Sequence, residues 1–279
     1  MAKEKKSTNK KLANKITYWV LLGFFCLVFI GSGIYVADYL IRSNQANTEY
    51  DNLLDLYVPP SRPSIEDLTN PTQPTDPTVP GIPTILPELV PFYERNQELV
   101  GWITVPDTKI SYPVLQSPTR PDYYLYRTFE GMRSDWGAIY VREACDVFTP
   151  SDNITIYGHH MKDGSMFSGL DGYKRQSFWQ THQYIYFDTL YERHVYQVIA
   201  AFKTSGTYGN GYAYHLFADA KNEDEFNQFI NTVKSLAYYE TGITAQYGDK
   251  LITLSTCEYT IYENGEAVGR HVVIAKRIA

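Results

Sequence analysis

The sequence predicts a mainly β domain, a barrel or a sandwich, joined to an N-terminal membrane segment. Seven or eight short runs rich in Val, Ile, Thr and aromatic residues lie between residues 101 and 277, as is typical of all-β architectures. By contrast, residues 16–37 contain no charged residue. A stretch rich in Pro and Thr separates the two parts, and the 194 residues from 86 to 279 suffice for one domain.

Charge is distributed unevenly along the chain. Residues 1–15 hold six lysines and one glutamate, a local net charge of +5. The whole chain carries −6, so the remainder carries −11. Nucleic-acid binding needs a basic face. An acidic globular part therefore argues against a nucleic-acid partner. The lysines of residues 1–15 predict a basic cytoplasmic tail.

The apolar segment is long enough to cross a membrane. Its 22 residues, at about 1.5 Å each, span a hydrocarbon core of about 30 Å, and we predict a signal-anchor helix over residues 16–41. Lysines precede it, so the positive-inside rule places the N-terminus in the cytoplasm and the bulk of the chain outside the cell. The sequence thus predicts a single-pass membrane protein. A cleaved secretory signal is the alternative, and it also exports the globular part.

Residues 42–85 are predicted to form a stalk and a linker. Residues 38–57 have a composition that permits a continued helix, whereas residues 59–87 are dominated by Pro and Thr. Proline fixes φ and removes a backbone donor, which favours an extended, poorly packed chain. The linker would hold a catalytic domain at residues 86–279 away from the membrane.

The predicted strands share β-branched and aromatic residues bounded by turn-forming ones. They are residues 101–106, 111–116, 137–141, 153–158, 184–189, 194–204, 250–256 and 270–277. Pro113 within the second run indicates a sheet edge or a bend, because proline cannot donate to a ladder.

Helices are fewer. We predict one over residues 88–100, a short one over 176–183 and a clear one over 222–236. In the last, an apolar stripe at helical spacing predicts core packing, and its members are Phe226, Phe229, Ile230, Val233 and Leu236.

Cysteine use singles out one residue. Cys26 lies in the membrane segment, and Cys145 and Cys257 lie outside it. The outer two form either a disulfide or two free thiols, and a free thiol in an exported protein is a candidate reactive group. Cys257 ends the predicted strand 250–256, where a nucleophile can reach a barrel rim. For Cys145, in a loop-like stretch, we predict a partly buried structural thiol.

A pair of histidines follows another predicted strand. His159 and His160 come directly after Gly158, which ends the strand 153–158. Imidazole titrates near neutral pH and suits proton transfer. Adjacent residues of an extended chain point in opposite directions, so the two are poor co-ligands and we predict no metal site.

An arginine begins the last predicted strand. Asn264-Gly265 favours a tight turn between Cys257 and Arg270. If the flanking strands pair as a hairpin, the thiol and the guanidinium lie opposite each other. A guanidinium there can donate hydrogen bonds to a developing oxyanion.

These motifs resemble one enzyme family. The segments YGHHM (157–161), TLSTC (253–257) and GRHVVIAKR (269–277) resemble class B sortases, membrane-anchored transpeptidases of Gram-positive bacteria. The segments ELVGWITVPDTKISYPVLQ (98–116) and KDGSMFSGL (162–170) are also similar to that family. The resemblance runs from about residue 92 to residue 277, essentially the whole predicted domain.

The resemblance implies an eight-stranded sortase-type β-barrel with an N-terminal helix and a long helix between strands six and seven. It implies a catalytic set of Cys257, His159 and Arg270, with no cofactor. It also implies a groove for the sorting signal, formed by Leu115, Tyr157, Ser255 and Glu258.

The expected reaction is a cysteine transpeptidation. The enzyme would cleave a C-terminal sorting signal after Thr and transfer the surface protein, through a thioacyl-enzyme, to a cell-wall amine. Expected partners are surface proteins with that signal, a peptidoglycan precursor or pilin amine acceptor, and the membrane. The alternatives are a pilin-polymerising sortase that joins subunits through Lys, a hydrolytic cysteine peptidase, and a non-catalytic surface-binding module.

Overall fold

The computed structural model describes residues 2–62, 84–207 and 209–279, with side chains from residue 15 onward. Most of the predicted Pro/Thr-rich linker lies outside the described residues. The chain divides into two compact units, residues 1–49 and 50–279. The predicted boundaries at residues 15, 41 and 85 stay predictions.

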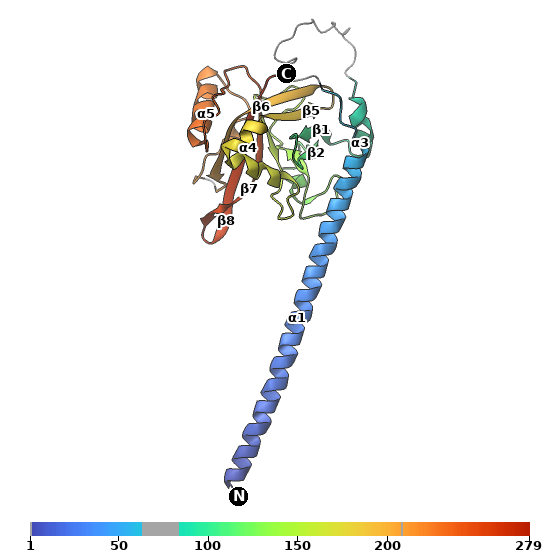
Figure 1. The fold of residues 1–279 in the computed structure, drawn as a ribbon, viewed down its shortest axis with the longest axis vertical. Coiled ribbons are helices and arrows are strands. Elements are labelled where there is room, and N and C mark those ends of the chain that lie inside the picture. The colour runs from blue at the N-terminus through green and yellow to red at the C-terminus, as the bar shows by residue number, and fades with distance from the viewer. Residues whose placement is uncertain (1, 63–83, 208) are drawn as a thin grey trace. The chain divides into compact units, whose positions relative to one another are not determined.

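The first unit is helical. It is the larger part of α1 (Ala2–Leu56), drawn in blue in Figure 1. From residue 15 onward this helix is long and apolar enough, by length and composition, to cross a membrane. The N-terminal apolar helix is therefore compatible with the predicted anchor at residues 16–41.

The second unit is built on a closed barrel, as predicted. The strand order is β1-β2-β3-β4-β7-β8-β6-β5, and Figure 1 shows the strands grouped between α5 (Glu223–Leu236) and α3 (Val90–Arg95). The strands are β1 (Leu99–Thr104), β2 (Ser111–Leu115), β3 (Ile139–Val141), β4 (Asn153–Tyr157), β5 (Tyr184–Thr189), β6 (Arg193–Ser205), β7 (Leu251–Glu263) and β8 (Glu266–Arg277). Because the barrel is closed, each of these strands pairs with a neighbour on both sides, and the sheet has no long free edge.

Pro113 sits where a missing donor does little harm. It pairs with Trp102 of β1, whereas the parallel pairing of β2 with β3 begins one residue later, at Val114. The predicted edge character is therefore local, because β2 is an inner strand of the closed barrel from Val114 onward.

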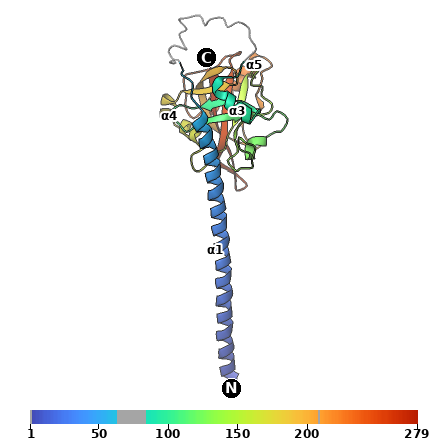
Figure 2. The same cartoon turned by 90° about the vertical axis from the view of Figure 1, so that its right-hand side faces the viewer.

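The last hairpin is longer than predicted. Residues 257–269 continue β7 and β8 instead of forming a loop, and the hairpin extends beyond the barrel in Figures 1 and 2. Its turn is Asn264-Gly265, with φ of 52° and 87°. Two positive φ values match a tight hairpin turn. The register shifts once, between Glu258 and Tyr262.

The helix before β1 is shorter than predicted. A 3-10 helix η1 (Pro87–Leu89) leads into α3 (Val90–Arg95). Asn96 ends α3 because its backbone is extended and its side chain accepts a hydrogen bond from the Glu98 N–H at 2.9 Å. The expectation of helix through residue 100 is therefore wrong, because the chain has turned into β1.

The long helix lies where predicted, between β6 and β7. It is α5 (Glu223–Leu236), and Asn222 caps it by accepting a hydrogen bond from the Glu225 N–H. Its apolar stripe packs on residues of β6, β7 and β8, except Leu236, whose side chain is exposed at the helix end. Figures 1 and 2 show α5 and α3 on opposite sides of the barrel.

The end of α1 belongs to the barrel unit. Tyr57 stacks on Trp102 with ring centroids 3.9 Å apart, and the Tyr50 hydroxyl donates to the Gly137 carbonyl at 2.7 Å. Arg62 pairs with the buried Asp188 of β5 at 2.5 Å. Residues 50–62 are thus part of the barrel unit.

A glycine fixes the packing at the end of β4. A Cβ on Gly158 would lie 2.5 Å from the Ile139 side chain and 2.7 Å from the Phe167 ring. The chain beyond β4 can approach these two side chains only because this position has no Cβ. The 3-10 helix that begins at Phe167 therefore packs directly against the chain at Gly158 and His159.

We predict that Gly158→Ala lowers the free energy of unfolding by about 1–3 kcal/mol, because two buried side chains must move to make room. Chemical denaturation monitored by circular dichroism measures this. Gly169→Ala is the control, since its Cβ would lie 3.3 Å from the flexible Ile110 side chain. Equal losses in the two variants would contradict the steric role of Gly158.

Candidate active site

Three neighbouring strands, β4, β7 and β8, carry or lead directly into the predicted catalytic residues. β4 runs parallel to β7 with Tyr157 opposite Ser255. The Gly158 N–H continues this pairing by donating to the Ser255 carbonyl at 3.1 Å. Two residues further along each chain come His159, just past the end of β4, and Cys257 of β7, so a continued parallel register would make them neighbours.

The opposite side of β7 supplies the arginine. In the antiparallel β7–β8 pair, Cys257 lies directly opposite Arg270. An uninterrupted pairing from Tyr262 with Ala267 would have placed Val272 there, so the register shift in the hairpin aligns Arg270 with the cysteine. The structure therefore confirms the hairpin and the predicted pairing of these two residues.

Cys257 is a free, half-buried thiol on β7. Cys145 is free and buried elsewhere, where its Sγ lies 3.5 Å from both the Asn153 carbonyl and the Thr155 N–H. Burial raises the pKa of Cys145. The disulfide alternative is therefore wrong, and Cys145 is the structural thiol that the sequence predicts.

His159 has a defined tautomer in this structure. Its Nε2 lies 2.6 Å from the Leu125 carbonyl oxygen, which can only accept, so Nε2 carries the proton and Nδ1 is left for proton transfer. Burial lowers the pKa of His159, and the charge of Arg270 lowers it further, against opposing effects of the Leu125 carbonyl and Asp135. The neutral imidazole is therefore favoured near pH 7.

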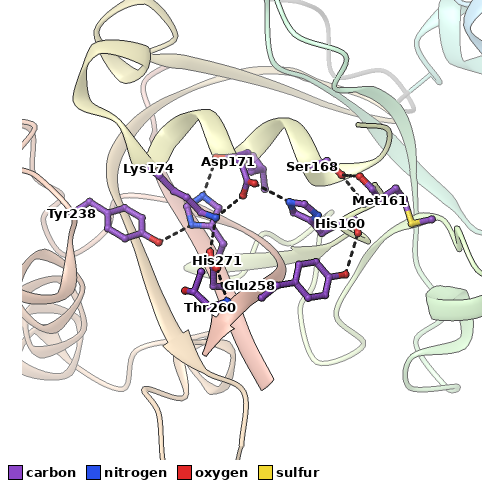
Figure 3. Close-up of polar contacts among 11 residues, drawn as sticks. His160, Met161, Ser168, Asp171, Lys174, Tyr238, Glu258, Thr260 and His271 are labelled. Carbon is purple, nitrogen blue, oxygen red and sulfur yellow. Dashed lines mark hydrogen bonds and ion pairs between the residues drawn. The ribbon is translucent and has the colours of Figure 1, made fainter. Parts of the chain in front are cut away.

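The His160 side chain points away from that of His159, as predicted for adjacent residues of an extended chain, and it binds a different partner. Its Nε2 lies 2.9 Å from Asp171 Oδ2, a contact drawn in Figure 3. That hydrogen bond raises the pKa of His160. Burial opposes ionisation of Asp171, but its contacts with His160 and Lys174 outweigh burial and hold the pKa of Asp171 well below its usual range.

Arg270 has room for its guanidinium beside a glycine. Its Cζ lies 3.1 Å from where a Cβ on Gly206 would sit. One N–H donates to the Gly269 carbonyl at 2.9 Å. A guanidinium has five N–H donors in a planar fork, and this contact uses one of them.

Three of the four predicted groove residues, Leu115, Tyr157 and Ser255, lie in one row of paired residues across the barrel strands, and Glu258 lies further along β7. Leu115 is opposite Tyr140, Tyr140 is opposite Tyr157, and Tyr157 is opposite Ser255. Only Tyr157 of the four predicted groove residues is partly exposed. Leu115 is 0%, Ser255 1% and Glu258 3% exposed. Substrate binding by these four residues stays a prediction.

The sequence analysis did not predict the contacts that other side chains make at this site. The buried Tyr214 hydroxyl lies 2.6 Å from Ser255 Oγ, and Lys174 Nζ lies 2.5 Å from Glu258 Oε2. Asp171 and Lys174 are three residues apart, a spacing visible in the sequence, but their partners are distant in the chain. No local pattern predicts such contacts.

Comparison with known proteins identifies the family. The Sortase domain family model matches residues 103–278. Sortase B of Staphylococcus aureus is 33% identical over 194 residues, which cover 70% of this chain and 76% of that protein. Sortase B of Listeria monocytogenes is 30% identical over 190 residues, covering 68% and 75%.

A solved structure shares the fold. The Staphylococcus aureus sortase B-substrate complex superposes with a TM-score of 0.67 at 27% identity, covering 85% of this chain and 98% of that chain. With a free cysteine and an arginine paired on β7 and β8 of an eight-stranded barrel, and a histidine just past the end of the adjacent β4, the chain belongs to the sortase family and is a class B cysteine transpeptidase.

Proposed function

We propose that Cys257, His159 and Arg270 cleave a C-terminal sorting signal after Thr and transfer the surface protein to a cell-wall amine. The observation that carries this proposal is the register of β4, β7 and β8, which pairs Cys257 with Arg270 and ends the parallel β4–β7 ladder two residues before His159 and Cys257. The substrate complex of the Staphylococcus aureus relative supports a substrate-binding site in this fold.

The first half-reaction forms a thioester. Nδ1 of His159 takes the proton of the Cys257 thiol, and the resulting thiolate attacks the Thr carbonyl carbon. Arg270 N–H groups hydrogen-bond to the oxyanion of the tetrahedral intermediate. The peptide C–N bond then breaks as His159 gives its proton to the departing amine.

The second half-reaction transfers the acyl group. The neutral His159 accepts a proton from the incoming amine, which attacks the thioester carbon. The C–S bond breaks, a new amide forms, and the Cys257 thiol is restored by that proton. No cofactor enters either step, because proton and acyl transfers balance within these groups.

The groove beside the proposed catalytic residues would bind the sorting signal. Because Tyr157 is partly exposed, we assign it direct contact with the peptide. Leu115 and Ser255 are buried and would form the floor of the groove, whereas the buried Glu258, whose carboxylate pairs with Lys174, would support that floor from the opposite face of β7. The apolar α1 would anchor the enzyme with its N-terminus in the cytoplasm, so the barrel would meet exported surface proteins and wall amines outside the membrane.

Substitution of the cysteine tests the nucleophile. We expect Cys257→Ala to abolish the covalent adduct between the full chain and a sorting peptide, seen by intact mass spectrometry, because no sulfur remains to be acylated. A small pentapeptide library of NPxTx, SPxTG, PPxTG and LPxTG types supplies the peptide. Cys145→Ala is the matched control and should keep the adduct. An adduct that survives in Cys257→Ala refutes the assignment.

The two histidines provide an internal comparison. His159→Ala should slow peptide cleavage by about 10²–10⁴-fold, the usual contribution of a proton-transfer group. His160→Ala should slow it less, by at most about 100-fold, because its ring binds Asp171 and transfers no proton. Steady-state cleavage rates decide, and near-normal rates in both variants would show that proton transfer lies elsewhere.

The ionisation of these histidines should also differ. An NMR titration of the imidazoles should place the pKa of His159 below about 6.5 and that of His160 above it. Asp171→Asn should lower the pKa of His160, since the carboxylate that favours its charged form is lost. The contribution of the His160–Asp171 pair to stability should be full between about pH 4 and pH 6.5, and it should disappear as pH rises through the folded pKa of His160. Equal midpoints for both rings would contradict the two environments.

The acceptor amine requires a product analysis. The acyl-enzyme should pass its peptide to an added wall-derived amine, and mass spectrometry of the ligated product would identify it. Transfer to a pilin lysine alone would assign pilus assembly. Release of free acid in excess amine would instead indicate a hydrolytic peptidase.

A further inference from the structure

One short helix contacts the chain directly after each proposed catalytic residue. The helix is η3 (Phe167–Lys174). His159, Cys257 and Arg270 are each followed by a polar residue, respectively His160, Glu258 and His271. All three of these following side chains bond to η3, as Figure 3 shows.

The first contact holds the histidine segment. Asp171 binds the His160 ring at 2.9 Å. Ser168 fixes the next residue, because its hydroxyl accepts from the Met161 N–H at 2.6 Å and donates to the Met161 carbonyl at 2.7 Å. The N–H of Phe167 donates to the His159 carbonyl at 3.0 Å. The backbone of residues 159–161 is thus tied to η3 from three positions.

The second contact holds the cysteine strand. The Glu258 side chain is 2% exposed, and Lys174 Nζ lies 2.5 Å from its Oε2 and 2.9 Å from Asp171 Oδ1. The other oxygen of Glu258 accepts from the Thr260 N–H at 3.0 Å, inside the stretch where the hairpin register shifts. Lys174 is therefore linked through Glu258 to the irregularity that aligns Cys257 with Arg270.

The third contact holds the arginine strand. His271 is fully buried, and its Nε2 donates to the Leu170 carbonyl at 2.8 Å. Its Nδ1 lies 3.3 Å from the Tyr238 hydroxyl, which can donate to it. Burial lowers the pKa of His271, which favours this neutral, doubly bonded ring.

The periodicities of helix and strand explain why the contacts of His160 and Glu258 lie on one face of η3, while His271 bonds to the backbone of the same helix. Side chains three apart in a 3-10 helix lie above one another, so Ser168, Asp171 and Lys174 share one face of η3. Successive strand side chains point to opposite faces. A residue directed toward the substrate is therefore followed by one directed toward η3.

We propose that η3 is a brace behind the active site, and that Asp171 and Lys174 are positioning residues that set the spacing of the Cys257 sulfur from His159 and Arg270. This inference rests on the catalytic roles proposed above. Neither positioning residue is assigned contact with the reacting atoms. Each acts through the neighbour of a catalytic residue.

The test compares charge removal with charge retention in the full chain, purified in detergent. Lys174→Met and Asp171→Asn should each lower kcat for cleavage of the best library peptide by about 10–100-fold, with KM changed less than about threefold, because misplaced groups lose rate in the chemical step. Lys174→Arg should recover most of the rate, since it keeps the cation. Lys234→Met and Asp224→Asn, the same changes on the exposed face of α5, should leave kcat unchanged.

Three results would overturn the brace. Unchanged kcat in both variants would show that η3 does not position the site. A rise in KM at constant kcat would assign Lys174 to substrate binding through Glu258. A lower melting temperature with normal kcat at a temperature where the variant is folded would make the contacts structural only. If Lys174→Met does not fold, Asp171→Asn and Ser168→Ala carry the same comparison. Failure of the catalytic roles themselves appears separately, as an adduct that persists in Cys257→Ala.

Discussion

The parallel pairing of β4 with β7 is the constraint on which the rest of the site depends. These strands are far apart in the sequence, yet five consecutive pairs from Asn153 with Leu251 to Tyr157 with Ser255 join them. Both are inner strands of a closed barrel, so a slip of one residue would turn a buried face outward. The positions of His159 and Cys257 are therefore set by the whole barrel, although each residue lies just past a regular pair.

The hairpin of β7 and β8 adds the arginine by an irregularity. A regular ladder from the Asn264-Gly265 turn would oppose Cys257 with a valine, and the shift between Glu258 and Tyr262 replaces it with Arg270. Such bulges often redirect a side chain at a functional site. Here the Glu258 carboxylate accepts a hydrogen bond within the shifted stretch and also pairs with Lys174. Burial would raise the pKa of Glu258, but these contacts lower it.

Much of this arrangement is predictable from the sequence, for identifiable reasons. The strands carry clear β-branched runs, α5 carries a stripe of Phe and Ile at helical spacing, and Asn264-Gly265 specifies a turn. The helix before β1 is shorter than its composition predicts, because the Asn96 side chain interrupts an otherwise helix-compatible segment. Contacts such as Lys174 with Glu258, or Tyr214 with Ser255, depend on barrel closure, and no pattern within a short window contains them.

The most direct test is a crystal structure of the chain with Cys257 covalently bound to a peptide mimetic whose carbonyl stands in for that of the scissile Thr. We expect the carbonyl oxygen to lie within hydrogen-bonding distance of the Arg270 guanidinium, with Nδ1 of His159 facing the sulfur. A guanidinium directed away from that oxygen, or an imidazole on the far side of β4, would contradict the proposed arrangement of the three residues at β4, β7 and β8.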